Sequence, residues 1–285
     1  MLSSSRTWWL IEMKLNIPSS IELSDIYVSD PFTLYEMENV FEDKVYNKLR
    51  EEFPDRSFFN KSYGKEEHGN KSYLHSNEPL FFDFLEQSEV WKNLYLTMNT
   101  ETTVKKLFSL MIDDIKKLPE RKKFPRLITL ENIKFFPRWN LSFMSKLYDR
   151  ISKLMNPKVN RIRVLFEFSR IGNDCFVPPH TEVDRKIFNL LLYFPDQNIS
   201  EFDRNRLGTR FYKRTKKNLD TWESTYMDAD EAKNFQNNYE VFHTAKFSEN
   251  KFIGLIKSSN SWHDTETFND LKEDRKSFNM FFYQC

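Results

Sequence analysis

Glycine and cysteine are both scarce in this chain of 285 residues, which has 5 glycines and 2 cysteines. The sequence contains no GxGxxG, GxxxxGK[ST] or GxSxG motif, which argues against a phosphate-cradling loop and against a serine-hydrolase elbow. Two cysteines, Cys175 and Cys285, cannot form the disulfide framework of a small secreted domain. We therefore expect free thiols and a reducing, intracellular setting.

A charge excess and long apolar runs are also missing. The formal net charge is +1, so no global field draws the protein to nucleic acid or to a membrane. No run approaches the roughly 18 apolar residues of a membrane span, and the WWLI segment near the N-terminus is too short for the core of a signal peptide. We expect a soluble, cytoplasmic protein without nucleic-acid or membrane partners, and the sequence leaves the oligomeric state open.

Aromatic residues are abundant, because they make up 16% of the chain and 28 of them are phenylalanines. This is ample material for a packed core, so the charged residues are expected on the surface. Helical periodicity dominates the first half, over residues 41–53 and 79–115, and short strand patterns dominate the second half. The strands are expected at 161–170, with one face in water, and at 186–194, 207–213, 239–247, 251–258 and 277–285. Residues 56–78 and 196–206 are expected to be polar loops, a short helix is expected around 141–154, and 216–238 reads as a polar, helix-biased insertion. This order of helices and strands predicts an α+β fold.

The most informative stretch is residues 178–194, in which two prolines lead to His180 and Glu182 and an apolar run, IFNLLLYF, follows. On an extended backbone, residues two apart point to the same side, so the imidazole and the carboxylate can converge. Another histidine, His263, lies far downstream in SNSWHDTE. Two histidines and one carboxylate with open positions opposite them form the ligand set of non-haem Fe(II) sites that activate oxygen.

Four pieces of the sequence, in this order, resemble the 2-oxoglutarate/Fe(II)-dependent oxygenases on their prolyl-hydroxylase-like side. They read PHTEVDRKIFNLLLYF (179–194), LGTRFYK (207–213), NKFIGLIKSSNSWHDTE (250–266) and DRKSFNMFFY (274–283). The resemblance covers roughly residues 160–285. It implies a double-stranded β-helix, or jelly roll, with N-terminal helices packed outside. We expect a single domain over 1–285, with a mainly helical lead-in and supporting strands at 1–158 and the jelly-roll core with its metal site at 159–285.

The resemblance also implies the metal ligands and the reaction. His180, Glu182 and His263 would hold Fe(II), although the family usually has aspartate where Glu182 stands, and Asp184 is a possible substitute ligand. The implied activity is that of a dioxygenase that uses O2 and 2-oxoglutarate, with ascorbate as a supporting reductant. Its usual outcome is hydroxylation of a substrate with release of succinate and CO2.

Further residues are implied in binding the co-substrate. Arg275 would grip the distal carboxylate of 2-oxoglutarate, since guanidinium binds carboxylate with two parallel hydrogen bonds, and Ser277 could add a hydroxyl. Lys186 is a second possible carboxylate partner, and Asn189 and Tyr193 could point into the barrel beside the co-substrate.

Other functions remain open at the level of sequence. A non-catalytic jelly-roll binding protein would keep the fold without the reaction, and the glutamate at position 182 keeps this reading open. A cupin-like enzyme with another divalent metal is the other alternative. The substrate, a small molecule or a peptide, is not specified by the sequence.

Overall fold

The fold is described from a computed structural model, which covers residues 13–17, 24–59, 61–63, 71–118, 129–131, 133–135, 160–173, 175–215 and 229–284. The helix expected around 141–154 lies outside these residues. Among the described residues, no helix is both long and apolar enough to cross a membrane.

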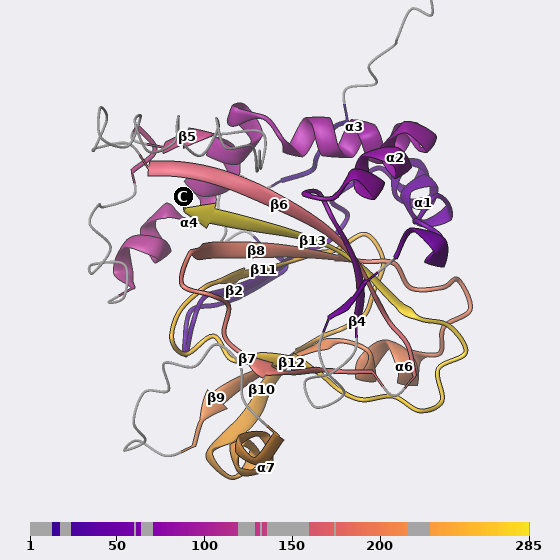
Figure 1. The fold of residues 1–285 in the computed structure, drawn as a ribbon. Coiled ribbons are helices and arrows are strands. Elements are labelled where there is room, and N and C mark those ends of the chain that lie inside the picture. The colour runs from indigo at the N-terminus through magenta and orange to yellow at the C-terminus, as the bar shows by residue number, and fades with distance from the viewer. Residues whose placement is uncertain are drawn as a thin grey trace, which may run out of the picture.

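Four helices in the first half of the chain form a layer on one side of the molecule (Figure 1). They are α1 (Asp43–Glu51), α2 (Pro79–Gln87), α3 (Glu89–Met98) and α4 (Glu101–Lys117). The Ser88 and Thr100 side chains accept hydrogen bonds from backbone N–H groups in the first turns of α3 and α4, as N-caps do. The helices predicted from periodicity are therefore confirmed.

A large sheet lies beneath the helices. In spatial order it contains β1 (Ile26–Val28), β2 (Leu34–Met37), β11 (Phe252–Ile256), β8 (Lys186–Tyr193), β13 (Arg275–Gln284), β6 (Asn160–Ile171), β4 (Lys71–His75) and β3 (Lys61–Tyr63). A further strand, β5 (Ile133–Phe135), pairs parallel with β6, and every other pair is antiparallel.

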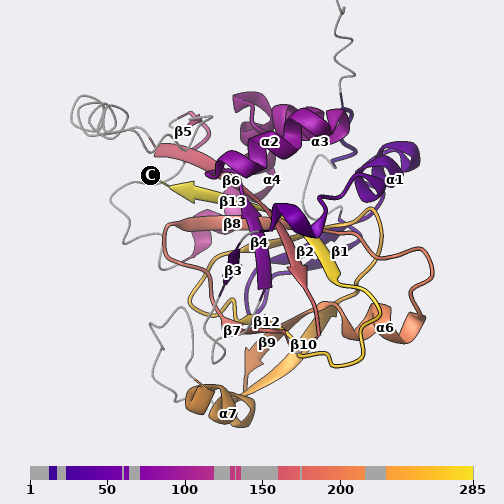
Figure 2. The same cartoon turned by 45° about the vertical axis from the view of Figure 1, so that its right-hand side comes forward.

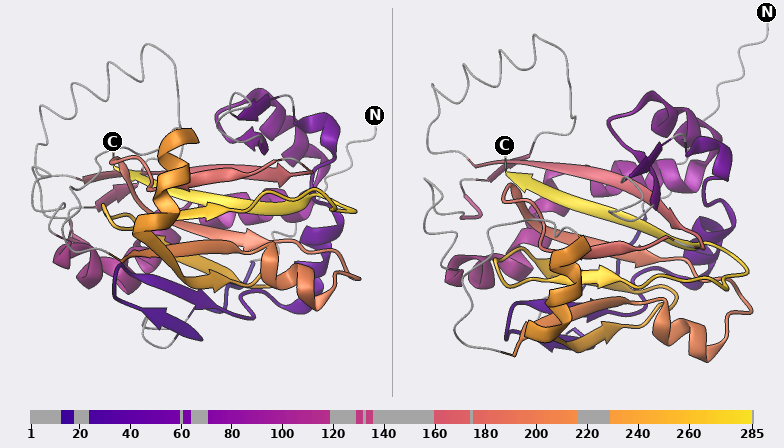
Figure 3. Two further views of the ribbon diagram at one scale, coloured as in Figure 1. Left: turned by 90° about the horizontal axis from the view of Figure 1, so that it is seen from below. Right: turned by 60° about the horizontal axis from the view of Figure 1, so that its bottom comes forward.

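A small sheet forms the third layer, on the face of the large sheet that the helices leave open (Figures 1 and 2). Its order is β10 (Tyr239–Ala245), β9 (Thr209–Arg214), β12 (His263–Thr265) and β7 (Val177–His180). Two short helices, α6 (Glu201–Arg206) and α7 (Ala229–Asn238), flank this sheet, with α7 on its outer side (Figure 3). From β6 to β13 the chain visits the sheets in the order large, small, large, small, small, large, small, large.

The alternation of side chains along the strands separates two cores. On β8, Phe188, Leu190 and Leu192 face the helices, and the Phe188 ring lies 4.9 Å from that of Phe108 on α4. Tyr193 instead packs between the two sheets with apolar residues of β9 and β11. Because the inner face of β8 looks toward the small sheet, its polar side chains are delivered to the space between the sheets.

Three expectations about the elements were wrong. Residues 196–206 include helix α6, and residues 56–78 include β4 as well as a short 3₁₀ helix at Arg56–Phe58. The expected wet face of the strand at 161–170 is absent, because Arg161 and Glu167 on that face are both buried, and Glu167 is surrounded by Lys71 and His75 of β4 and Asn279 of β13. The predicted α+β class itself is confirmed. The two sheets are separate and do not close into one barrel.

Candidate metal centre

The two histidines predicted as ligands come from neighbouring strands of the small sheet. His180 is the last residue of β7 and His263 is the first of β12, and the two are direct partners in the antiparallel register. Their ring centroids lie 4.2 Å apart. Residues 83 positions apart in the sequence are thus held side by side by backbone pairing.

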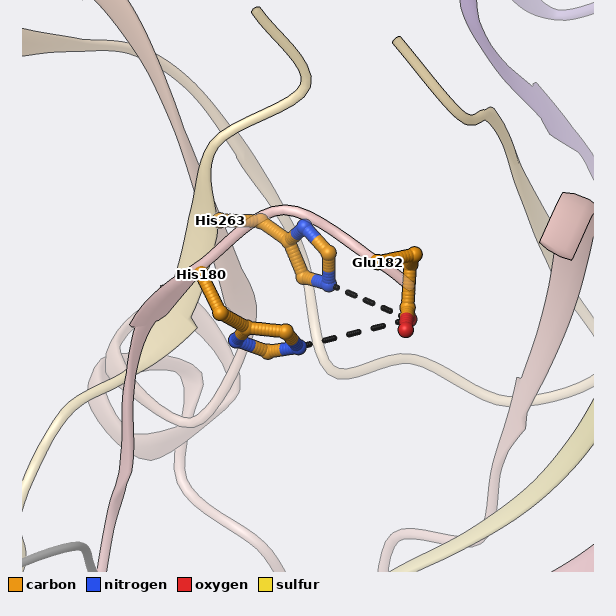
Figure 4. Close-up of side chains that lie close together, drawn as sticks. All are labelled: His180, Glu182 and His263. Atoms are coloured by element: carbon orange, nitrogen blue, oxygen red, sulfur yellow. Dashed lines mark ion pairs between the residues drawn. The ribbon is translucent and has the colours of Figure 1, made fainter. Parts of the chain in front are cut away.

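Glu182 completes the cluster from the loop that follows β7 (Figure 4). Its Oε1 atom lies 4.0 Å from Nε2 of His180 and 3.6 Å from Nε2 of His263. One ligand atom from each residue lies within 4.8 Å of the others, and all three residues are buried. A cation with bonds of about 2.1 Å spans up to about 4.2 Å between two ligands, so the pairs that share Oε1 are within bridging reach.

Hydrogen bonds orient both imidazole rings. Nδ1 of His180 lies 2.9 Å from the carbonyl oxygen of Pro178, and Nδ1 of His263 lies 2.9 Å from that of Ser261. A carbonyl oxygen only accepts, so Nδ1 carries the hydrogen in each ring and Nε2 faces the carboxylate as a ligand atom. Such a hydrogen bond from the second ring nitrogen is the usual support of a metal-binding histidine.

The protonation states suit metal binding. Burial, together with the neighbouring His263, lowers the pKa of His180 to about 3, so its imidazole is neutral near pH 7. For Glu182, burial raises the pKa, but the Lys186 ammonium and the two histidines outweigh it and bring the pKa well below its ordinary value. Metal ligands must be deprotonated, and both groups are.

Two residues predicted as co-substrate contacts, Lys186 and Asn189, meet the ligand carboxylate. The Lys186 ammonium donates a short hydrogen bond to Oε2 of Glu182 and stacks over the Phe281 ring, 3.7 Å from its centroid. Asn189 donates from Nδ2 to Oε1 at 2.9 Å. Oε2 is therefore occupied by an ammonium, and Oε1 is the oxygen presented to the histidines.

Asp184, the possible substitute ligand, is far more exposed than Glu182. Its side chain is 88% exposed and lies 3.9 Å from Lys257. Among the described residues the cluster of ligand atoms comprises His180, Glu182 and His263. The structure therefore places Glu182, rather than Asp184, beside the histidines.

Arg275 is buried at the far end of the space between the sheets. Its Nε donates to the carbonyl of Leu207 at 2.6 Å, its Nη2 donates to Oγ1 of Thr209 at 3.1 Å, and the guanidinium stacks over the Tyr193 ring. The neighbouring Asp274 pairs with Arg56 and Arg170 instead. Within the part of the chain that the structure describes, no carboxylate lies within ion-pair distance of Arg275.

One cavity contains both the ligand cluster and this guanidinium. It measures about 60 Å³ and lies between the sheets. Its lining includes His180, Glu182, His263, Asn189, Arg275, Ser277 and Thr209. The ring of Tyr193 packs against the Arg275 guanidinium. Its hydroxyl shares a 2.6 Å hydrogen bond with Oγ1 of Thr209, which also contacts Arg275. The arrangement offers a place for a cation and, beside it, a place for a carboxylate.

Sequence reasoning missed a charged cluster next to the site. The carboxylate of Glu167 on β6 accepts hydrogen bonds from Lys71 at 2.8 Å, from Asn279 at 2.7 Å and lies 2.6 Å from Nε2 of His75. The signal was present as a glutamate within an apolar strand, but the partners lie on strands distant in sequence. His243 on β10 lies outside the ligand cluster, with its Nε2 2.6 Å from Oε1 of Glu36.

Comparisons with known proteins give structural similarity at low sequence identity. No family model matches the chain, and no curated protein matches it. A prolyl-4-hydroxylase from Pseudomonas putida is 9% identical, with a TM-score of 0.48 over 88% of this chain and 92% of that one. The epimerase SnoN in complex with Fe3+, alpha-ketoglutarate and nogalamycin RO is 9% identical, with a TM-score of 0.45 over 88% and 78%. The viral collagen prolyl hydroxylase of Paramecium bursaria Chlorella virus 1 is 8% identical, with a TM-score of 0.39 over 90% and 99%.

Proposed function

We propose that this protein is an Fe(II)- and 2-oxoglutarate-dependent oxygenase that hydroxylates a small-molecule or peptide substrate. The observation that carries the proposal is the shared cavity, which brings two histidines and an ionised carboxylate together with a buried arginine that has no acidic partner among the described residues. A cation would bind the histidines and the carboxylate at one end of this cavity, and one carboxylate of a dicarboxylate would pair with the arginine at the other end.

We also infer that strands β6–β13 form the double-stranded β-helix of such an enzyme, within one domain over residues 1–285. The inference is supported by the way the eight strands alternate between the large and the small sheet. In this arrangement the metal ligands lie on the small sheet and its following loop, and the arginine lies on the last strand of the large sheet.

The residues of the cavity have two proposed roles, metal binding and co-substrate binding. His180, Glu182 and His263 would hold Fe(II), and Arg275 with Ser277 would bind the distal carboxylate of 2-oxoglutarate. When bound, iron and co-substrate supply oxygen activation, in which one oxygen atom enters the substrate and the other enters the succinate formed as CO2 leaves. The chain contributes open metal positions, a fixed guanidinium and burial that keeps bulk water from the reacting groups.

Metal binding and turnover of matched variants test the proposal. Purified protein should bind Co(II), a spectroscopic substitute for Fe(II), with one equivalent per chain, and should release succinate from 2-oxoglutarate when Fe(II) and ascorbate are present. His180→Ala should lower the affinity for Co(II) by at least tenfold and abolish succinate release, because one of three ligands is lost. His243→Ala, which removes a histidine outside the cluster, should change neither.

One observation favours a second candidate, a metal-free binding protein with the same fold. The Lys186 ammonium already neutralises Glu182 without any ion. Wild-type protein that took up no Co(II), and whose unfolding temperature did not respond to Co(II) or Fe(II), would support this candidate and overturn the oxygenase.

A further inference from the structure

A second cavity adjoins the metal ligands on the side of β4. It measures about 200 Å³. It shares five lining residues with the cavity that holds Arg275, namely Lys71, Val177, His180, Glu182 and Phe281. The proposed function assigns the Arg275 cavity to 2-oxoglutarate, and this second cavity gives a further molecule access to the metal ligands His180 and Glu182. The inference below rests on that function.

Lys71 is the cation at the boundary of the two cavities. Its Nζ lies 2.8 Å from Oε1 of Glu167, and its side chain is 19% exposed. An ammonium has three hydrogens, and among the described residues Glu167 is the one acceptor that Lys71 meets. Two donors of Lys71 are therefore available to a bound molecule.

The acidic groups of the cavity, in contrast, are already engaged. Glu167 is buried and receives Lys71, His75 and Asn279 on its two oxygens. Its pKa is held far below the ordinary range, because Lys71 and His75 outweigh the effect of burial. The other carboxylate, Glu182, meets Lys186 and Asn189. Both carboxylates among the described lining residues are thus engaged by donors, whereas Lys71 still offers donors to an anionic substrate.

The remaining wall of the cavity is apolar and its size is limited. The apolar lining residues are Leu165, Phe176, Val177, Pro178, Val183 and Phe281, with the ring of Tyr283 beside them. Sites for drug-sized ligands measure about 300–1,000 Å³, so about 200 Å³ suits a smaller molecule. The hydrocarbon part of a ligand that packs against this wall would lie next to the metal ligands His180 and Glu182.

We propose that this cavity binds a small carboxylic acid with an aliphatic or aromatic body, whose carboxylate accepts hydrogen bonds from the Lys71 ammonium. The carboxylate fixes one end of the molecule, and the apolar wall places its carbon chain beside the metal ligands. Lys71 is thus a specificity-determining residue, distinct from Arg275, which serves the co-substrate.

A binding experiment without turnover tests this proposal. Saturated and phenyl-terminated carboxylic acids of three to nine carbons, with their amides and amines, are titrated against Zn(II)-loaded protein containing saturating 2-oxoglutarate and followed by ligand-observed NMR. At least one acid should bind tenfold or more tightly than its amide and its amine. Lys71→Met should remove this preference, and Lys213→Met, which removes an exposed lysine paired with Glu240, should keep it.

The variants also separate this proposal from the proposed function. Arg275→Met should lose 2-oxoglutarate and retain the acid, whereas Lys71→Met should do the reverse. If Lys71→Met does not fold, the double variant Lys71→Met/Glu167→Gln removes the ion pair as a unit and should show the same loss. Equal binding of acid and amide, absence of any binding acid, or a preference that survives without Lys71 overturns the proposal. Failure of the wild type to bind 2-oxoglutarate would instead overturn the oxygenase function.

Discussion

The carboxylate of Glu182 is held in place by two neighbouring side chains. Glutamate is one methylene longer than aspartate, so its carboxylate has more rotamers to lose when it is fixed. The bond from Lys186 to Oε2 and the 2.9 Å bond from Asn189 to Oε1 select one orientation. This orientation directs a single oxygen toward the two histidines, and we expect Glu182 to bind an ion through Oε1 alone.

Lys186 should oppose metal binding even as it orients the ligand. An ammonium and a divalent cation about 5 Å apart repel by about 7 kcal/mol at an effective dielectric constant of about 20. We expect Lys186→Met to tighten Co(II) binding by roughly tenfold or more, measured by competition with a chelator at pH 7.5. Lys276→Met, which removes a lysine that pairs with Asp196 at 3.0 Å, is the matched control. An unchanged or weaker affinity in Lys186→Met would show that orientation outweighs charge.

The sequence predicted which residues meet at the cluster but not which neighbours hold them. His180 and Glu182 were predicted from their spacing and His263 from the resemblance. Lys186 and Asn189 are three apart and would lie on opposite faces of a regular strand. The pairing of β8 with β13 shifts register near Lys186, and this irregularity brings both side chains to Glu182. Strand alternation alone could not reveal such a shift.

At the scale of elements, strand β6 is the case in which the sequence pattern predicted a solvent-exposed face that the structure does not have. The sequence RIRVLFEFSR alternates charged and apolar residues, which is typical of a strand with one face in water. In the structure Glu167 is buried because Lys71, His75 and Asn279, from β4 and β13, surround its carboxylate. Those partners lie 92 to 112 residues away along the chain, so a local pattern could not identify them.

The contact between β2 and β11 depends on a glycine. A Cβ atom at Gly254 would lie 1.9 Å from the Tyr35 ring, whose hydroxyl meets the Met111 sulfur at 2.9 Å. We expect Gly254→Ala to lower the free energy of unfolding by about 1–3 kcal/mol, as overpacking does, in urea denaturation followed by circular dichroism. At Gly172 a Cβ would meet only the Asp274 carboxylate, at 3.1 Å, so Gly172→Ala should cost less. Equal effects in the two variants would contradict this account.

At the scale of the whole molecule, the buried His180 should make stability depend on pH. Its pKa is lowered from 6.5 to about 3 in the folded protein, so below pH 6.5 the unfolded chain binds a proton that the folded chain refuses. The free energy of unfolding of the metal-free protein should therefore fall as pH decreases from 6.5 toward 3, with a contribution of up to about 1.4 kcal/mol per pH unit.

Urea denaturation at pH 7.0, 6.0 and 5.0 measures this dependence. His180→Gln removes the titrating group, so the difference in unfolding free energy between wild type and variant should shrink as pH falls. Parallel curves for the two proteins would show that His180 titrates normally in the folded state.

The three-layer arrangement was predictable in kind, because helices precede strands and the strands are short. The assignment of each strand to one sheet or the other was not predictable, since it depends on pairing between segments such as β6 and β13 that lie far apart in the chain. The same distance explains why residues of the site come from both ends of the second half of the sequence.

The position of β13 bears on how the protein is made. This strand follows every other described strand in the chain, yet it lies between β8 and β6 in the middle of the large sheet. While the ribosome is still adding β13, β6 and β8 each expose an unpaired edge, which invites pairing with foreign strands. Until β13 is inserted these edges remain open to such pairing, and Arg275 reaches its place only with that strand.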